Sequence, residues 1–216
     1  MNKIAQLLAY IFHPLNIPMM GLLLLLYSPS IPKSFLVIDS FYYAHPAVKT
    51  MLILLFALFT WAAPLLTIFF LKRSGEIESL EMDNREERNL PIGFMIFFYM
   101  IFFALIYFYI PQNVVPKSVS AILLGGFIGL IGVRYLNKEM KISLHATGMG
   151  MLTGAVYTHY LGMSSFPIWM LPTLFIVSGI VISSRIYLKK HDLRESLFGY
   201  LTGFLAQLLT GLFFFS

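Results

Sequence analysis

Long apolar runs, broken by short polar stretches, dominate the chain from end to end. The runs lie at 5–27, 47–71, 92–110, 118–135, 146–163, 167–184 and 196–215. Each holds roughly 17 to 25 residues, the length that crosses about 30 Å of hydrocarbon as an α-helix. Helices also satisfy their own backbone polar groups inside lipid. The pattern predicts an all-α, polytopic transmembrane helix bundle of six to seven spans, forming a single integral membrane domain over residues 1–216.

Two of these runs have features that are unusual in a helix that crosses the membrane without a break. The run 5–27 contains His13 next to Pro14, and the run 146–163 contains three threonines and a histidine. Proline leaves backbone groups of the preceding turn without their helical partners, so His13-Pro14 indicates a break between a surface helix and a span. Either run is compatible with a kinked or re-entrant segment, which is why the expected count stays at six to seven.

Composition supports the same class of protein. Of the 216 residues, 58% are hydrophobic and 12% are charged, too few polar side chains to cover the surface of a water-soluble domain. The chain contains no cysteine, which excludes disulfides, thiolate catalysis and cysteine-ligated zinc. We expect bilayer lipids around the protein, no nucleic-acid partner, and neither a metal nor another cofactor. The oligomeric state stays open.

Charged residues gather on one side of the bundle if the runs alternate across the membrane. That side holds the N-terminus and the connections 72–91, 136–145 and 185–195, with 12 of the 15 Lys and Arg residues and nine of the ten acids. The positive-inside rule predicts that this face is cytoplasmic, in the cell membrane. A phosphate site would gather cations there in either orientation. Even without four such cations, eight basic residues on this face stand against three on the other.

The connection 72–91 combines six acids with two arginines near its end. The acids are Glu76, Glu78, Glu81, Asp83, Glu86 and Glu87. We interpret them as a solvated surface of mixed charge, which contributes little energy. Arg85 and Arg88 are three residues apart, so a helical turn directs both at one point just before Pro91. They are candidates for binding an anion, and the alternative is structural pairing with the neighbouring glutamates.

A second candidate segment runs from Lys141 through Ser143 and His145 to Gly148 and opens the fifth apolar run. The start of a helix favours an anion because its first N–H groups lack partners and the helix dipole is positive there. Ser143 is also a natural N-cap. The alternative interpretation is that Ser143 only caps the helix and that His145 anchors it at the level of the lipid headgroups.

The third candidate segment contains His191 and Glu195, one helical turn apart. A carboxylate at that spacing can accept a hydrogen bond from one ring nitrogen and leave the other to attack an electrophile. Arg185 ends the preceding run and offers a fork of donors suited to phosphate oxygens. Gly199 and Gly203, four residues apart, predict the close approach of a neighbouring helix. The alternative is a hydrogen bond at the membrane interface without catalytic consequence.

These motifs resemble those of the type-2 phosphatidic acid phosphatase superfamily of integral membrane lipid phosphate phosphatases. The family pattern is Ser-Arg, five residues, His, three residues, Asp, then two glycines four apart; Ser184, Arg185, His191, Glu195, Gly199 and Gly203 match it, with Glu in place of Asp. The middle family motif, Pro-Ser-Gly-His, is represented by Ile142-Ser143-Leu144-His145. The first motif, Lys, six residues, Arg-Pro, has Arg85 to Pro91 as its nearest counterpart, with Glu81 where the Lys is expected.

The resemblance covers residues 72–206 and implies a phosphatase-like core with a metal-independent hydrolase mechanism. By analogy with the family, His191 attacks phosphorus to form a phosphohistidine, Glu195 orients it, and His145 protonates the leaving lipid alkoxide. The phosphate oxygens are held by substrate-binding residues, namely Arg185, Arg88, Arg85, Ser143 and Lys141. The substrate implied is a lipid phosphate or an isoprenyl (di)phosphate.

Two other classes of function stay open at this point. One is a non-catalytic membrane protein, such as a transporter or a lipid-binding relative that keeps the helix bundle; the near absence of charges inside the runs disfavours an ion relay. The other is a lipid phosphotransferase, which passes the phosphoryl group to a second lipid. The remaining histidines, His13, His45 and His159, are interpreted as structural.

Overall fold

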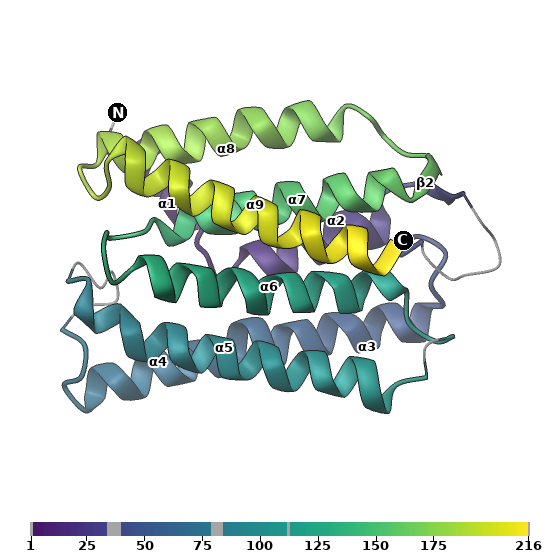
Figure 1. Cartoon of the computed structure of the whole chain (residues 1–216), viewed down its shortest axis with the longest axis horizontal. Coiled ribbons are helices and arrows are strands. Elements are labelled where there is room, and N and C mark those ends of the chain that lie inside the picture. The colour runs from purple at the N-terminus through teal and green to yellow at the C-terminus, as the bar shows by residue number, and fades with distance from the viewer. Residues whose placement is uncertain (1, 34–39, 79–83, 112, 216) are drawn as a thin grey trace.

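The computed structural model describes residues 2–33, 40–78, 84–111 and 113–215, and this part of the chain is almost entirely helical. The helices lie nearly parallel in one elongated bundle (Figure 1). In chain order the elements are α1 (Asn2–Ile11), α2 (Ile17–Tyr27), β1 (Ile31–Pro32), α3 (Pro46–Phe56), the π-helical η1 (Ala57–Ala62), α4 (Ala63–Arg73), the 3-10 turn η2 (Glu86–Arg88), α5 (Asn89–Ala104), the π-helical η3 (Leu105–Tyr109), α6 (Lys117–Leu136), α7 (Leu144–Leu161), β2 (Met163–Ser165), α8 (Met170–Tyr187) and α9 (Leu193–Phe215). The predicted all-α class is confirmed at this level.

Five helical segments are long and apolar enough to cross a membrane, among the residues described. They are Pro46–Arg73, Glu86–Tyr109, Lys117–Leu136, Met170–Tyr187 and Leu193–Phe214. Their most apolar windows have mean hydropathies between 1.5 and 2.3. The structure therefore supports a membrane protein with five candidate spans, fewer than the six to seven expected from the sequence.

The two weak apolar runs account for this difference. The run 5–27 divides into α1 and α2, because the chain leaves the helix around Pro14 and resumes at Ile17, with Pro18 in the first turn. The predicted break at His13-Pro14 is confirmed. The second weak run forms α7, which is continuous for 18 residues but is not among the candidate spans. Its threonines and histidines lower its hydropathy, and it is buried by protein over most of its length.

Helix α7 is the centre of the bundle and packs most extensively against α9. Glycines let the two backbones approach. A Cβ atom on Gly199 would lie 2.8 Å from the carbonyl oxygen of Ser143, and one on Gly203 would collide with the carbonyl oxygen of Thr147. From the other side, Cβ atoms on Gly150 and Gly154 would collide with the backbone of α9. The predicted close approach at Gly199 and Gly203 is confirmed, and α7 supplies a second glycine pair at the same spacing.

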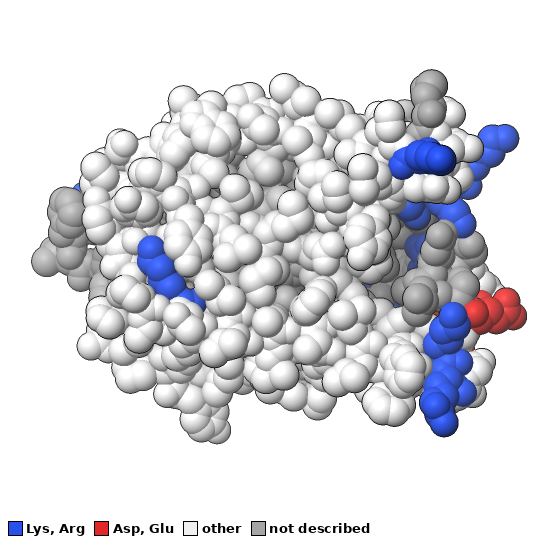
Figure 2. All heavy atoms as spheres, turned by 180° about the vertical axis from the view of Figure 1, so that it is seen from behind, with Lys and Arg blue, Asp and Glu red and all other residues white. Residues whose placement is uncertain are grey.

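The connections divide between the two ends of the bundle. At one end, on the left of Figure 1, lie α1 and the links α4–α5, α6–α7 and α8–α9. At the other end, β1 pairs antiparallel with β2, Ile31 opposite Ser165. Figure 2, which shows the bundle from behind, has most of the visible Lys and Arg at the end that carries those three links.

Candidate functional site

Backbone and side-chain hydrogen bonds join the three links that carry the candidate residues. Arg88 Nη1 donates to the carbonyl oxygen of Ile142 over 2.9 Å, and Asn137 Nδ2 donates to that of Arg85 over 3.1 Å. The Ser143 amide donates to the carbonyl oxygen of Glu195 at 3.3 Å. Segments far apart in the sequence thus meet at one end of the bundle, as convergence of the three motifs requires.

His191 and Glu195 form the pair predicted from their spacing. His191 Nδ1 lies 2.8 Å from Glu195 Oε2 and 3.1 Å from the carbonyl oxygen of Lys141. Both partners accept hydrogen bonds when the carboxyl group is ionised, so Nδ1 carries the hydrogen. Nε2 of the neutral ring then carries a lone pair instead of a hydrogen, and this nitrogen makes no hydrogen bond within the described part of the chain. This is the tautomer that a nucleophilic imidazole needs.

The protonation state of His191 follows from its surroundings. The pKa of His191 is lowered to about 4, mainly by burial and also by the charges of Arg88 and Arg185. The hydrogen bond to Glu195 acts in the opposite direction and raises the pKa. The ring is therefore neutral near pH 7. Two guanidinium groups close enough to disfavour the imidazolium are also close enough to attract an anion to the same place.

Glu195 has a second task that the sequence reasoning missed. Its backbone N–H donates to Asp192 Oδ1 over 2.7 Å, and its Oε2 accepts from the Asp192 N–H at 3.3 Å. This reciprocal arrangement is a capping box at the start of α9, and the Asp-x-x-Glu spacing in the sequence is its signal. The cap holds the carboxylate in position to orient His191.

Ser143 and His145 begin α7. Ser143 is fully buried and its Oγ accepts from the Ala146 N–H at 3.4 Å, so it is the N-cap of the helix. His145 Nε2 lies 3.0 Å from the carbonyl oxygen of Ala9 and therefore carries the hydrogen. Burial, followed by the charge of Arg185, lowers the pKa of His145 to about 3. The neutral ring has its lone pair on Nδ1.

The cations assigned to substrate binding are placed unequally. Arg88 is buried between the links, and the charge of Arg185 acts on His13, His145 and His191. Lys141 contributes its carbonyl to His191. Arg85 is joined to the site through its backbone, and no described hydrogen bond links its guanidinium to the histidines. Glu81 and Asp83, expected on a solvated surface, lie outside the described residues.

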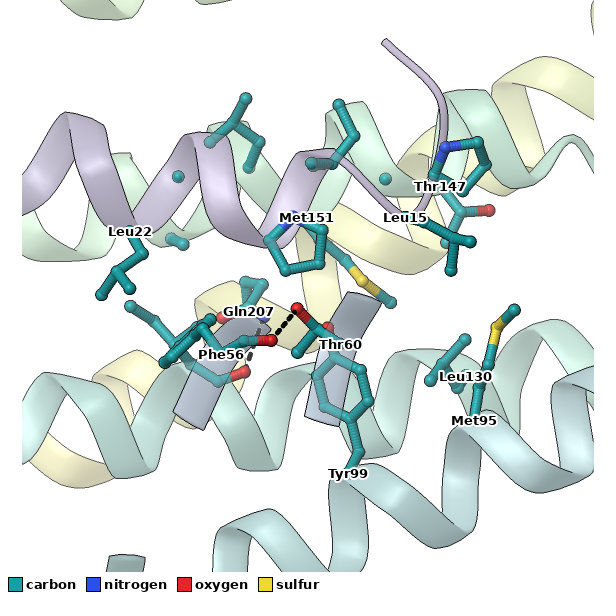
Figure 3. A pocket seen from close by; sticks show the side chains of 18 of the residues that line it. Leu15, Leu22, Phe56, Thr60, Met95, Tyr99, Leu130, Thr147, Met151 and Gln207 are labelled. Carbon is teal, nitrogen blue, oxygen red and sulfur yellow. Dashed lines mark hydrogen bonds between the residues drawn. The ribbon is translucent and has the colours of Figure 1, made fainter. Parts of the chain in front are cut away.

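An apolar pocket follows α7 into the bundle (Figure 3), and none of the candidate site residues is among those that line it. Its α7 lining begins at Leu144, next to His145, and recurs every three or four residues to Val156, a rise of about 18 Å. Pro14 and Leu15 line it at the break between α1 and α2. Its cavity volume is about 90 Å³, and part of it is open to the surface. No single apolar run of the sequence indicated this pocket, because several helices form its walls.

His159, which we interpret as structural, lies far from the histidines of the candidate site. It is almost fully buried near the end of α7, where its ring packs edge-on against Phe41 and Phe166. His45 lies at that same end and N-caps α3. Within the described residues, no group of three or more His, Asp or Glu side chains is arranged to hold a metal ion.

Comparisons with protein-family models, with curated proteins and with solved structures returned no match to this chain.

Proposed function

We propose that this protein is a metal-independent membrane phosphatase that hydrolyses a lipid phosphate or an isoprenyl (di)phosphate. The observation that carries the proposal is the position of the His191–Glu195 pair, beside two arginines and near the start of a long apolar pocket. A phosphorylated amphiphile has the two properties that this arrangement complements. Its phosphate is an anion, and its chain is apolar.

The pocket favours a lipid over a water-soluble phosphate. Its α7 wall extends for about 18 Å, which exceeds half the thickness of a hydrocarbon core of about 30 Å. The lining is apolar apart from a few groups such as Thr60, Tyr99 and Gln207 (Figure 3). The Thr60 hydroxyl and one N–H of the Gln207 amide already donate to backbone carbonyl oxygens. A hydrocarbon chain would therefore meet mainly apolar side chains.

The chemistry proposed is in-line displacement at phosphorus. The Nε2 lone pair of His191 attacks, a P–N bond forms, and the bond from phosphorus to the lipid oxygen breaks. The leaving alkoxide takes a proton and becomes the lipid alcohol; the resemblance assigns this proton transfer to His145, which must take up a proton before the P–O bond breaks because its ring is neutral near pH 7. Water then attacks the phosphohistidine: a new P–O bond forms, the P–N bond breaks, one proton of the water passes to His145, and inorganic phosphate leaves neutral His191. Glu195 stabilises the positive charge that His191 acquires during attack.

Fixed donors would supply the stabilisation that a metal provides in other phosphatases. Arg88 and Arg185 would neutralise charge on the phosphate oxygens, with Arg85 and Lys141 in support. The first N–H groups of α7 would add backbone donors, and the Ser143 hydroxyl would add a side-chain donor. Leu144 stands where the family has glycine, so the approach of an oxyanion to this backbone is narrower. This predicts a slower enzyme than a family member with the complete motif.

The finer topology belongs to the same proposal. We infer that α7 crosses the membrane shielded by the other helices, with α2 partly inserted beside it, which restores the six to seven crossings expected from the sequence. The site would then lie at the basic end of the bundle, on the cytoplasmic face of the cell membrane by the positive-inside rule.

Phosphate release from purified protein tests the proposal. In detergent with a chelator, the wild type should release phosphate from isoprenyl or glycerolipid phosphates, and His191→Ala should lower kcat by at least about 10³-fold. Lys138→Ala, an exposed cation at the same end, is the matched control and should keep the rate. Release that persists in His191→Ala removes the nucleophile assignment. Phosphate found on a second lipid instead of in solution identifies a phosphotransferase.

A further inference from the structure

His13 lies against the candidate site, although it comes from a part of the chain that the family motifs do not reach. Its ring stands edge-to-face against His145, with centroids 5.7 Å apart. The charge of Arg185 acts on both rings. Its next two residues, Pro14 and Leu15, line the apolar pocket. His13 therefore lies where the anion site and the pocket meet.

Each of the three clustered histidines has one ring nitrogen held by a hydrogen bond. His191 Nδ1 donates to Glu195, and His145 Nε2 donates to the carbonyl oxygen of Ala9. His13 Nδ1 instead accepts from the Leu15 N–H over 3.4 Å. An accepting Nδ1 in a neutral ring requires the hydrogen on Nε2. Of the three neutral rings, His13 alone has its N–H on the nitrogen that is not held.

The charge state of His13 agrees with this tautomer. Burial, and then the charge of Arg185, lower the pKa of His13 below its ordinary value. The ring is neutral near pH 7, with a donor at Nε2 and an acceptor at Nδ1. A neutral imidazole in this state can stabilise developing negative charge by donating a hydrogen bond without transferring its proton.

His45 shows what a histidine in the same local setting does elsewhere in the chain. It also precedes a proline, and its Nδ1 also accepts from the N–H two residues later, that of Ala47, over 3.3 Å. That contact shapes the start of α3 at the opposite end of the bundle. The shared contact is thus a feature of the turn. The neighbours of the His13 ring, His145 and Arg185, are what distinguish the two.

We infer that His13 is a catalytic residue of the proposed phosphatase, whose Nε2–H donates a hydrogen bond to the ester oxygen that joins phosphate to the lipid chain. That oxygen must lie between the phosphate and the pocket, and His13 is the neighbour of the pocket-lining Pro14 while its ring contacts His145. The hydrogen bond strengthens as the P–O bond breaks and negative charge collects on the leaving oxygen. The inference rests on the proposed function and adds a residue from the break between α1 and α2.

The test compares two leaving groups. An alkyl lipid phosphate releases a strongly basic alkoxide, whereas nitrophenyl phosphate releases a stable anion that gains little from a donor. His13→Asn keeps an acceptor for the Leu15 N–H through an Asx-turn but removes Nε2. We expect kcat for the alkyl ester to fall by about 10- to 100-fold, with little change for the nitrophenyl ester. His45→Asn, the matched control, should leave both rates unchanged.

Four results would overturn the inference. Equal loss on both esters indicates a structural role or general phosphate binding, and unchanged rates on both indicate no role. A wild type that hydrolyses neither ester defeats the phosphatase proposal itself, and is recognised before any variant is measured. If His13→Asn unfolds, His13→Gln replaces it, because its longer amide retains a donor; it should hydrolyse the alkyl ester faster than His13→Ala, and equal rates of these two count against the inference.

Discussion

Replacing Gly203 with alanine tests whether the contact between α7 and α9 holds the candidate site together. The added Cβ would collide with the carbonyl oxygen of Thr147 and lie 2.9 Å from the Met151 nitrogen. These are backbone atoms of a helix, which cannot rotate away as a side chain can. The two helices must separate along the whole interface, including the Ser143–Glu195 hydrogen bond at its end.

The expected magnitude follows from two opposing effects. Overpacking of a well-packed interior costs about 1–3 kcal/mol, whereas alanine is favoured over glycine in a helix by up to about 1 kcal/mol. Because rigid backbone atoms are struck, we expect the upper part of the first range and a net loss of about 2 kcal/mol. For a chain of this size, that loss lowers Tm by roughly 4–8 °C.

Thermal unfolding in detergent, followed by circular dichroism, measures this loss. Gly179→Ala is the matched control, because Gly179 lies inside α8 and a Cβ there would have no neighbour within 4 Å. It should leave Tm unchanged or raise it by a few degrees, roughly, through helix propensity. If Gly203→Ala has the same Tm as Gly179→Ala, the close approach of α7 and α9 described here is wrong.

Three further predictions address charge and orientation. Glu195→Gln should lower kcat by at least about 10²-fold while Glu195→Asp retains part of the rate, since the carboxylate stabilises charge on His191; equal rates of the two variants would contradict this role. The free energy of unfolding should fall as the pH is lowered from about 7 to 5, with a contribution from His191 on the order of 1 kcal/mol. The reason is that the folded pKa of His191, about 4, lies below the ordinary 6.5, so the unfolded chain takes up the proton first. The fall should be smaller in His191→Gln, and an unchanged fall would show that other groups cause it. The chain has no native cysteine, so single cysteines can replace Lys117 and Lys138, which lie toward opposite ends of α6. They should be labelled from opposite sides of intact cells. A cysteine at position 138 that reacts only from outside would refute a cytoplasmic site.

Gly199 and Gly203 could be predicted to face one neighbour, because residues four apart on a helix face the same way wherever that helix packs, and both face α7. The contact of His191 with Glu195 was expected for the same reason, and the 2.8 Å distance agrees with it. The physical reason is different, because α9 begins at Leu193 and His191 precedes the helix; the capping box of Asp192 and Glu195 holds the carboxylate beside the ring. Asp192 carried an equally local signal, the capping box, which was overlooked.

The placement of His13 could not be predicted, because it depends on where a separate helix packs. The proline indicated a break, and the break is present. Its position beside His145 is decided by the packing of α1 against α8 and of α2 against α7. The apolar pocket likewise has walls from several helices, so no single run of residues could reveal it.

Hydrophobic length alone determined that this chain forms helices suited to a bilayer, because each long run must satisfy its own backbone polar groups. Short spacings determined which side chains share a helical turn. Tertiary structure decided the rest: that α7 is a central helix buried by the others, that Arg88, His145 and His191 gather at one end of the bundle, and that His13 packs against His145 there. These outcomes depend on contacts between residues distant in sequence, whose strength comes from shape and burial after folding and leaves no local pattern to detect.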